Sequence, residues 1–226
     1  MTSTAQAEGT VTIPLKGLAR TAARRMVKAW EAPVFHLGVD VDMTRALQRK
    51  NDVPGVTVSD VVLSACATAL RAHPRINAWY DDETVTVVDD VNIGLAVATD
   101  AGLMVPVIHQ ADRLDVSGIA AARRDVVERA RAGALGMPDV SGGTFTVSNL
   151  GMLGIDEFDA ILNVPQVSIL AVSSTSTRYV WTDDGGAWRP IARFTLTCDH
   201  RAIDGATGAA FLADLRRELE SGPSQS

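Results

Sequence analysis

Cysteine, membrane-length apolar runs and basic clusters are all scarce or missing in this sequence of 226 residues. The two cysteines, Cys66 and Cys198, suit a reducing compartment. No apolar run is long enough to span a bilayer, and the residues before Lys16 lack the apolar core of a signal peptide. We therefore expect a soluble cytoplasmic protein with no membrane partner.

Basic clusters do not exceed short runs such as Arg24-Arg25 and Arg123-Arg124, and the net charge is −6. Nucleic acid is therefore not expected as a partner. The sequence also lacks a P-loop, a GxGxxG segment after a strand and a Gly-x-Ser-x-Gly segment. These absences argue against phosphate-loop, dinucleotide-binding and serine-hydrolase classes.

Three of the four histidines, His36, His73 and His109, are scattered without the spacing of metal ligands. A zinc site is not expected from such a pattern. We interpret these three histidines as structural or surface residues, and we predict no bound metal.

The hydrophobic content of 46% is enough for a substantial core, and no low-complexity segment or long linker divides the chain. We predict one catalytic domain over residues 10–220, with flexible tails at 1–9 and 221–226. Apolar periodicity predicts helices over residues 19–30, 43–49, 59–71, 116–132 and 203–220. Ser59 and Asp60 supply capping chemistry at the start of the third of these helices.

Runs of β-branched and alternating residues predict strands over 11–14, 34–41, 84–88, 91–98, 103–108, 143–148, 167–172, 179–181 and 188–197. Pro106 indicates an edge strand or a bulge. The segment Asp183-Asp184-Gly185-Gly186 indicates a hairpin turn between the last two strands. The predicted class is therefore a mixed α/β chain.

The most informative segment is CDHRAIDG, from Cys198 to Gly205. A strand precedes it and a helix follows it, so His200 is predicted at a strand end. An imidazole has a pKa near ~6.5 and can exchange a proton at neutral pH, which makes His200 a candidate general base. Asp204 follows at helical spacing. The alternative is a buried histidine with a structural role.

A second polar segment, GGTFTVSNLG, ends a predicted strand with Ser148. A serine at this place can act as an oxyanion donor or a nucleophile. The alternative is a turn residue that bonds to its own backbone. Cys198 is close to His200 in sequence, but a small buried cysteine is the better interpretation.

Six segments in order resemble the catalytic domain of dihydrolipoamide acyltransferases, the core subunits of 2-oxo acid dehydrogenase complexes. The resemblance covers residues 13 to 219. It rests on these segments: GLARTAARRM, FHLGVDVDM, VSDVVLSACATALRAHPRINAW, VNIGLAVATDAGLMVPV, GGTFTVSNLG and LTCDHRAIDG.

The resemblance implies a chloramphenicol acetyltransferase-like two-layer sandwich, in which helices pack on a mixed sheet. It implies that His200 is the general base, that Asp204 keeps its surroundings in place, and that Ser148 donates to the tetrahedral intermediate. It also implies acetyl-CoA as the acyl donor, with no lipoyl group on this chain. The implied assembly is a homotrimer with active sites at the subunit interfaces. The resemblance marks no CoA-contacting residues.

We expect the chain to differ from complex subunits at its ends, without a lipoyl domain before it or a leucine-rich anchor after it. Val34 and His109 also differ from the residues common in the family. Our leading hypothesis is a stand-alone acetyltransferase that modifies a hydroxyl of a small or carrier-derived acceptor in natural-product, tetronate-like biosynthesis. The alternative is the core of a 2-oxo acid dehydrogenase complex. A third is a scaffold that has lost catalysis.

Overall fold

The computed structural model describes residues 11, 13–182 and 185–221. Its helices are α1 (Gly17–Trp30), α2 (Thr44–Asp52), α3 (Val58–Ala72), α4 (Val116–Arg131) and α5 (Gly205–Ser221). The strands are β1 (Val34–Asp42), β2 (Ala78–Asp81), β3 (Thr84–Val87), β4 (Ile93–Leu95), β5 (Val97–Thr99), β6 (Gly102–Met104), β7 (Val107–Ile108), β8 (Phe145–Asn149), β9 (Ser168–Thr182) and β10 (Gly185–Asp199).

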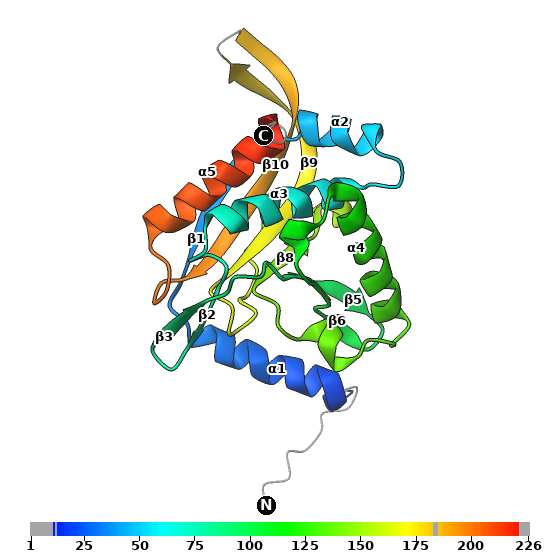
Figure 1. Cartoon of the computed structure of the whole chain (residues 1–226), viewed down its shortest axis with the longest axis vertical. Coiled ribbons are helices and arrows are strands. Elements are labelled where there is room, and N and C mark those ends of the chain that lie inside the picture. The colour runs from blue at the N-terminus through cyan, green and yellow to red at the C-terminus, as the bar shows by residue number, and fades with distance from the viewer. Residues whose placement is uncertain (1–10, 12, 183–184, 222–226) are drawn as a thin grey trace, which may run out of the picture.

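Six of these strands form one mixed sheet in the order β1-β10-β9-β8-β4-β7 (Figure 1). Strand β8 is parallel to both β4 and β9, and the other pairs are antiparallel. Two small two-stranded sheets, β2-β3 and β5-β6, lie beside it. The predicted class, a mixed sheet with helices packed on it, is confirmed.

The two faces of the large sheet differ because side chains alternate along each strand. On β9, Leu170 and Val172 belong to the main apolar cluster, which includes buried residues of α3, α4 and α5. Ile169 and Ala171 point the other way, into a smaller cluster with Ala29 of α1. We call these the helical face and the opposite face of the sheet.

Helix α5 lies close to β1 because residue 208 is glycine. A Cβ at Gly208 would be 2.6 Å from Leu37 Cδ1 and 3.5 Å from Cys198 Sγ. The glycine therefore allows α5 to pack directly on β1 and β10, the pair of strands beside the His200 turn.

Helix α3 begins at Val58, one residue before Ser59, the first of its predicted capping residues. Thr57 is the N-cap, and it exchanges hydrogen bonds with Asp60 in a capping box. The buried Asp60 also accepts from Arg123 Nε at 2.5 Å, which links α3 to α4. The expectation that Ser59 and Asp60 cap the helix was therefore wrong for Ser59, whereas Asp60 acts from inside the first turn.

Strands β9 and β10 form a long hairpin that projects at the top of Figure 1. Each has 15 residues, so the predicted strands were too short. A register shift between Ala192 and Phe194 bends the pair. The turn residues 183–184 lie outside the described residues.

Other predicted boundaries also changed. The strand expected over 91–98 is divided between two sheets, since Ala96 N–H donates to Val147 O between β4 and β5. Strand β2 was not predicted. Val11, Ile13 and Pro14 are not in a strand. The tails expected at 1–9 and 221–226 lie outside the described residues, except Ser221, which ends α5.

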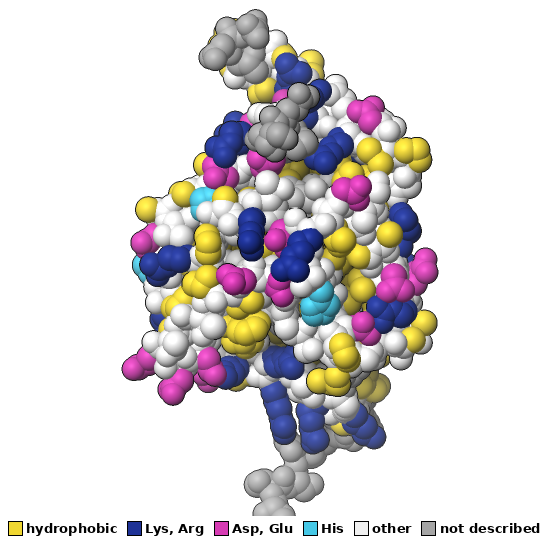
Figure 2. Space-filling view, viewed as in Figure 1, with side chains coloured by type: hydrophobic (Ala, Val, Ile, Leu, Met, Phe, Trp, Pro, Cys, Tyr) yellow, Lys and Arg dark blue, Asp and Glu magenta, His cyan; other side chains and the backbone are white. Residues whose placement is uncertain are grey.

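The helical spacing of α1 places on one side of the helix basic residues that are four positions apart in the sequence. Arg20, Arg24 and Lys28 recur every four residues on the exposed side of α1, and basic side chains collect at the bottom of Figure 2. No described helix combines the length and the apolar character needed to cross a membrane.

Candidate functional site

His200 lies in the turn between β10 and α5, where it is exposed. Its backbone N–H donates to Pro33 O at 2.9 Å. Its ring packs against Phe35, with 4.7 Å between ring centroids and a tilt of 51°. Phe35 itself packs on the main cluster. The predicted place at a strand end is confirmed, and the imidazole leans toward the helical face.

The residues on either side of His200 bind each other. The Asp199 carboxylate accepts from the backbone N–H of Arg201 at 3.0 Å and from its guanidinium at 2.6 and 2.9 Å. These bonds raise the pKa of Arg201. The guanidinium also lies 4.1 Å over the ring of Tyr80. We call Asp199, Arg201 and Tyr80 the turn clamp.

Asp204 caps α5, and the helix therefore begins at Gly205 rather than at residue 203. Its Oδ1 accepts from Thr207 N–H at 2.7 Å. The hydrogen bonds from Thr207 lower the pKa of Asp204, with smaller contributions from Arg75 and His200. Asp204 thus fixes the start of the helix and supplies negative charge near His200.

Ser148 is the half-buried residue before the last of β8. Within the described residues, its hydroxyl has no hydrogen-bond partner and is free to donate. Its neighbour Asn149 donates to Ser59 Oγ at 3.1 Å and accepts from Gly151 N–H at 2.9 Å. Asn149 therefore holds the end of β8 against α3 and the following turn. This role of Asn149 was not predicted from the sequence.

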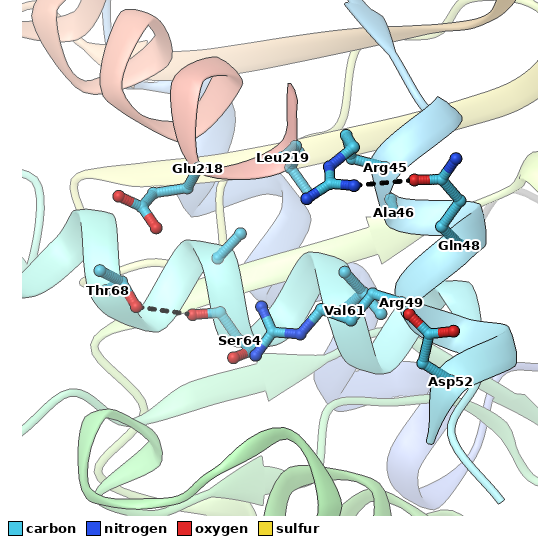
Figure 3. A pocket seen from close by; sticks show the side chains of 11 residues that line it. Arg45, Ala46, Gln48, Arg49, Asp52, Val61, Ser64, Thr68, Glu218 and Leu219 are labelled. Carbon is cyan, nitrogen blue, oxygen red and sulfur yellow. Dashed lines mark hydrogen bonds between the residues drawn. The ribbon is translucent and has the colours of Figure 1, made fainter. Parts of the chain in front are cut away.

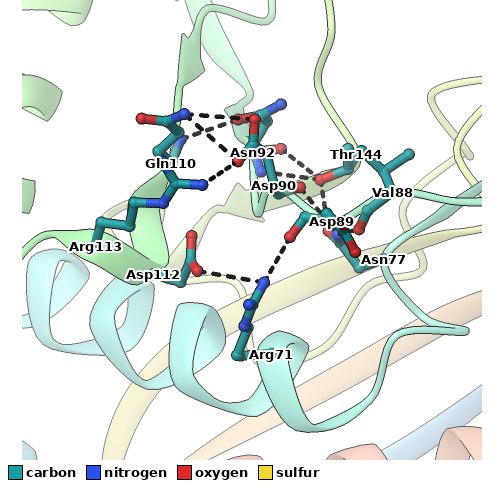
Figure 4. A network of polar contacts seen from close by, with 10 residues as sticks. All are labelled: Arg71, Asn77, Val88, Asp89, Asp90, Asn92, Gln110, Asp112, Arg113 and Thr144. Carbon is teal, nitrogen blue, oxygen red and sulfur yellow. Dashed lines mark hydrogen bonds and ion pairs between the residues drawn. The ribbon is translucent and has the colours of Figure 1, made fainter.

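A polar network fixes the other end of β8 (Figure 4). Asn92 Nδ2 donates to Gly142 O at 2.9 Å, and Asn92 Oδ1 accepts from Gln110 N–H at 2.9 Å. The buried Thr144 hydroxyl donates to Asn77 Oδ1 at 2.5 Å. In the sequence, the residues just before Phe145 are small. Small side chains leave the backbone oxygens of this segment accessible to the side-chain amides, which is the feature that could have indicated the network.

His200 and Ser148 do not meet within one chain. Ser148 is level with Ala171 of β9, and Cys198 is level with Ser168, so His200 is about five residues farther along and two strands away. At standard strand spacings the two Cα atoms are roughly 19 Å apart. Ser148 also shares the opposite face with Ala171, while the His200 ring contacts Phe35 on the helical face.

The other candidate residues have structural surroundings. Cys198 is fully buried, and burial raises its pKa to about 12, which confirms the interpretation as a buried cysteine. His36 bonds to Thr197 Oγ1 at 2.9 Å, His73 to Asp214 at 2.9 Å, and the exposed His109 to Pro138 O at 3.1 Å. Among the described residues, no group of three or more His, Cys, Asp or Glu could hold a metal.

A cavity of about 260 Å³ lies between α2, α3 and α5 (Figure 3). Its walls include Arg45, Arg49, Ser64 and Glu218. Neither His200 nor Ser148 lines it. The cavity is thus separate from both candidate catalytic residues.

The family model for the catalytic domain of 2-oxoacid dehydrogenases acyltransferase matches residues 7–225. The chain belongs to this family. A dihydrolipoyllysine-residue acetyltransferase component of the pyruvate dehydrogenase complex from Zymomonas mobilis is 33% identical over 96% of this chain. The corresponding Rickettsia bellii protein is 33% identical over 92% of it. The chain spans 53% and 52% of the length of these relatives, respectively.

Solved structures agree with this family. A probable dihydrolipoamide acetyltransferase from Listeria monocytogenes has a TM-score of 0.92 and 32% identity, covering 97% of this chain and 98% of the other. The Azotobacter vinelandii dihydrolipoamide acetyltransferase has a TM-score of 0.89 and 30% identity, with 97% of both chains covered. Chloramphenicol acetyltransferase, at 13% identity, has a TM-score of 0.58 and covers 87% of this chain and 94% of its own, which confirms the fold alone.

The leading sequence-based hypothesis, a stand-alone acetyltransferase of natural-product biosynthesis, was wrong. The matching family is that of 2-oxoacid dehydrogenases acyltransferase, and the two curated relatives are acetyltransferase components of pyruvate dehydrogenase complexes. The hypothesis relied on the two ends of the chain. Because the chain spans about half of its curated relatives, those ends say nothing about a whole protein.

Proposed function

We propose that this chain is the catalytic core of a dihydrolipoyl acyltransferase of a 2-oxo acid dehydrogenase complex. It would transfer an acetyl group between CoA and a dihydrolipoyl thiol. The observation that carries this proposal is the residue spacing in the Azotobacter enzyme, where a serine, a histidine and an asparagine have roles in catalysis. That serine precedes the histidine by 52 residues and the asparagine follows it by four. Ser148, His200 and Asp204 have the same spacings.

His200 is the general base in this proposal. A reference thiol has a pKa of ~8.5, about two units above that of imidazole, so a positioned histidine can remove the proton as the thiol attacks. The sulfur then bonds to the thioester carbonyl carbon. When the carbon–sulfur bond of the donor breaks, the imidazolium returns its proton to the leaving thiolate. The exchange is balanced without a covalent acyl-enzyme.

Ser148 stabilises the intermediate. As the carbonyl carbon becomes tetrahedral, its oxygen acquires negative charge. The hydroxyl of Ser148, which has no hydrogen-bond partner among the described residues, can donate to it. A well-placed donor of this kind contributes roughly 3–4 kcal/mol to transition-state stabilisation. Holding the two substrates together supplies a further gain from proximity.

The site assembles between two copies of the chain. One chain keeps His200 and Ser148 roughly 19 Å apart and on different sides of its sheet, too far for both to touch one carbonyl group. A closed ring lets each copy give its histidine face to one neighbour and its serine face to the other. We propose a homotrimer with three such sites, in agreement with the implication of the family resemblance.

The decisive experiment compares acceptors. We would incubate the protein with acetyl-CoA and either dihydrolipoamide or hydroxylated small molecules, and follow acetylated products by mass spectrometry. Transfer to dihydrolipoamide that disappears in His200→Gln is the expected result. The proposal fails if dihydrolipoamide is not acetylated, or if His200→Gln transfers acetyl groups at the wild-type rate.

A further inference from the structure

The backbone on both sides of His200 is fixed by hydrogen bonds. The peptide N–H before its Cα donates to Pro33 O at 2.9 Å. The peptide N–H after its Cα belongs to Arg201 and donates to Asp199 Oδ1 at 3.0 Å. Because both peptide planes are bonded, the two backbone dihedral angles of His200 are restricted, and with them the direction of its Cβ.

Arg201 completes this arrangement through its side chain. The Asp199 carboxylate is almost fully buried, with 3% of the side chain exposed. The Arg201 guanidinium bonds to both carboxylate oxygens, at 2.9 Å from Nε to Oδ1 and 2.6 Å from Nη2 to Oδ2. A buried carboxylate held by a planar fork of donors has little freedom to turn. The Asp199 carboxylate oxygen that accepts from the peptide N–H after His200 therefore stays in place.

The ring of Tyr80 packs against the guanidinium of Arg201. The Arg201 guanidinium carbon lies 4.1 Å from the centroid of the Tyr80 ring, within the range of a cation–π contact. Tyr80 is itself held, since its N–H donates to Pro165 O at 2.7 Å. Asp199 N–H likewise donates to Val167 O at 2.9 Å. The turn clamp thus connects the histidine turn to β2 and to the segment that leads into β9.

We propose that Arg201 and Tyr80 are positioning residues that aim the His200 imidazole at the acyl group. This inference rests on the proposed function only in taking His200 as the base. Without the clamp, the turn would keep the bond to Pro33 but lose its second restraint, and the imidazole would leave its contact with Phe35. A misplacement of about 1 Å near a reacting group can reduce turnover roughly 100-fold.

The test uses Arg201→Met, with Arg129→Met as its matched control. Arg129 is likewise an arginine held by carboxylates, those of Asp125 and Asp139, but it lies on α4. Both variants lose an ion pair, whereas only Arg201→Met should change the orientation of the His200 imidazole. We expect Arg201→Met to lower kcat by roughly 10–100-fold at nearly unchanged KM for acetyl-CoA, and Arg129→Met to change neither.

Tyr80 supplies a second pair of variants if Arg201→Met does not fold. Tyr80→Phe keeps the ring under the guanidinium and should retain wild-type kcat. Tyr80→Leu removes the ring and should lower kcat. The hydroxyl of Tyr80 has no hydrogen bond among the described residues, so the two variants differ mainly in the aromatic contact. Equal kcat values for Tyr80→Leu and the wild type would contradict the proposal.

Crystal structures of the variants separate this inference from the proposed function. In Arg201→Met or Tyr80→Leu, the imidazole of His200 should leave the orientation in which it packs on Phe35. An unmoved imidazole overturns the inference even if kcat falls. A moved imidazole supports the inference as a statement about position, even if His200→Gln later proves that histidine is not the base.

Discussion

The histidine half and the serine half of the proposed site are held in different ways. His200 lies on a turn, and it depends on Pro33, Phe35 and the turn clamp for its direction. Ser148 lies within β8, where the sheet itself fixes the side chain and leaves only the hydroxyl to rotate. A ring that must accept and return a proton needs its orientation set, whereas a hydroxyl can turn toward an oxyanion wherever it develops.

The largest expected effect comes from removing the base. His200→Gln keeps a polar side chain of similar size but cannot take up the thiol proton. We expect kcat to fall by about 10²–10⁴-fold. Steady-state kinetics at several pH values would measure this change. The melting temperature should stay near that of the wild type, because the imidazole is exposed and makes no hydrogen bond within the described residues. Unchanged kcat would exclude His200 as the base.

Ser148→Ala should produce the next largest effect. The hydroxyl acts only when negative charge develops, so its loss should lower kcat by roughly 10²–10³-fold and leave KM for acetyl-CoA nearly unchanged. Kinetics and equilibrium binding of CoA would check this separation. An effect confined to KM would assign Ser148 to substrate binding. Ser148 would then not be the group that donates to the developing oxyanion.

Much of the site could be predicted from the sequence, but the separation of His200 and Ser148 within one chain could not. The segments around His200 and Ser148 place both residues at strand ends, and Asp204 follows at capping distance. Their separation depends on the order β1-β10-β9-β8 and on the alternation of faces, which involve pairings between distant segments. Tyr80 was missed for the same reason, since β2 reaches Arg201 only through the tertiary fold.

The fold was predicted best where a local signal agreed with tertiary packing. Helix α4 has an N-cap at Asp115 and an apolar stripe, and its predicted range was nearly right. The strand expected over 91–98 failed because its apolar residues serve two sheets, a division that periodicity does not reveal. The predicted acceptor failed for another reason: it was inferred from the ends of the chain and not from residues near the chemistry.

Glycine substitutions would compare how tightly the backbone is packed near Ser148 and near His200. A Cβ on Gly151, in the turn after β8, would lie 2.7 Å from the backbone oxygen of Ser173, while a Cβ on Gly205 would meet nothing within 4 Å. We expect Gly151→Ala to lower the free energy of unfolding by about 1–3 kcal/mol. Gly205→Ala should cause little change. Denaturant unfolding at one protein concentration would measure both, and equal stabilities would show that the serine turn can yield.

Asp204→Asn should have the smallest effect, and that effect should depend on pH. The pKa of Asp204 is lowered in the folded chain, so its charge stabilises the fold above the reference value of about 3.9. This contribution is lost as the pH falls through the folded pKa. The wild type should therefore be slightly more stable than Asp204→Asn near neutral pH. The difference should begin to shrink below about pH 4 and vanish once the pH is below the lowered pKa of Asp204 in the folded chain.

Thermal unfolding across pH would check this prediction. Activity should remain close to wild type, because asparagine can still accept the hydrogen bond from Thr207. A stability difference that persists unchanged in acid would show that the charge of Asp204 is not its cause.

We propose that His200 of one copy and Ser148 of the next form one site. The most direct measurement mixes His200→Gln and Ser148→Ala subunits, each nearly inactive alone, by co-expression with different tags or by joint refolding. In a ring, each mixed trimer contains one interface with both native residues, so random mixing should restore about a quarter of the wild-type sites. Mixing two differently tagged His200→Gln preparations is the control. Mixed trimers that remain as inactive as the separate variants would contradict the account.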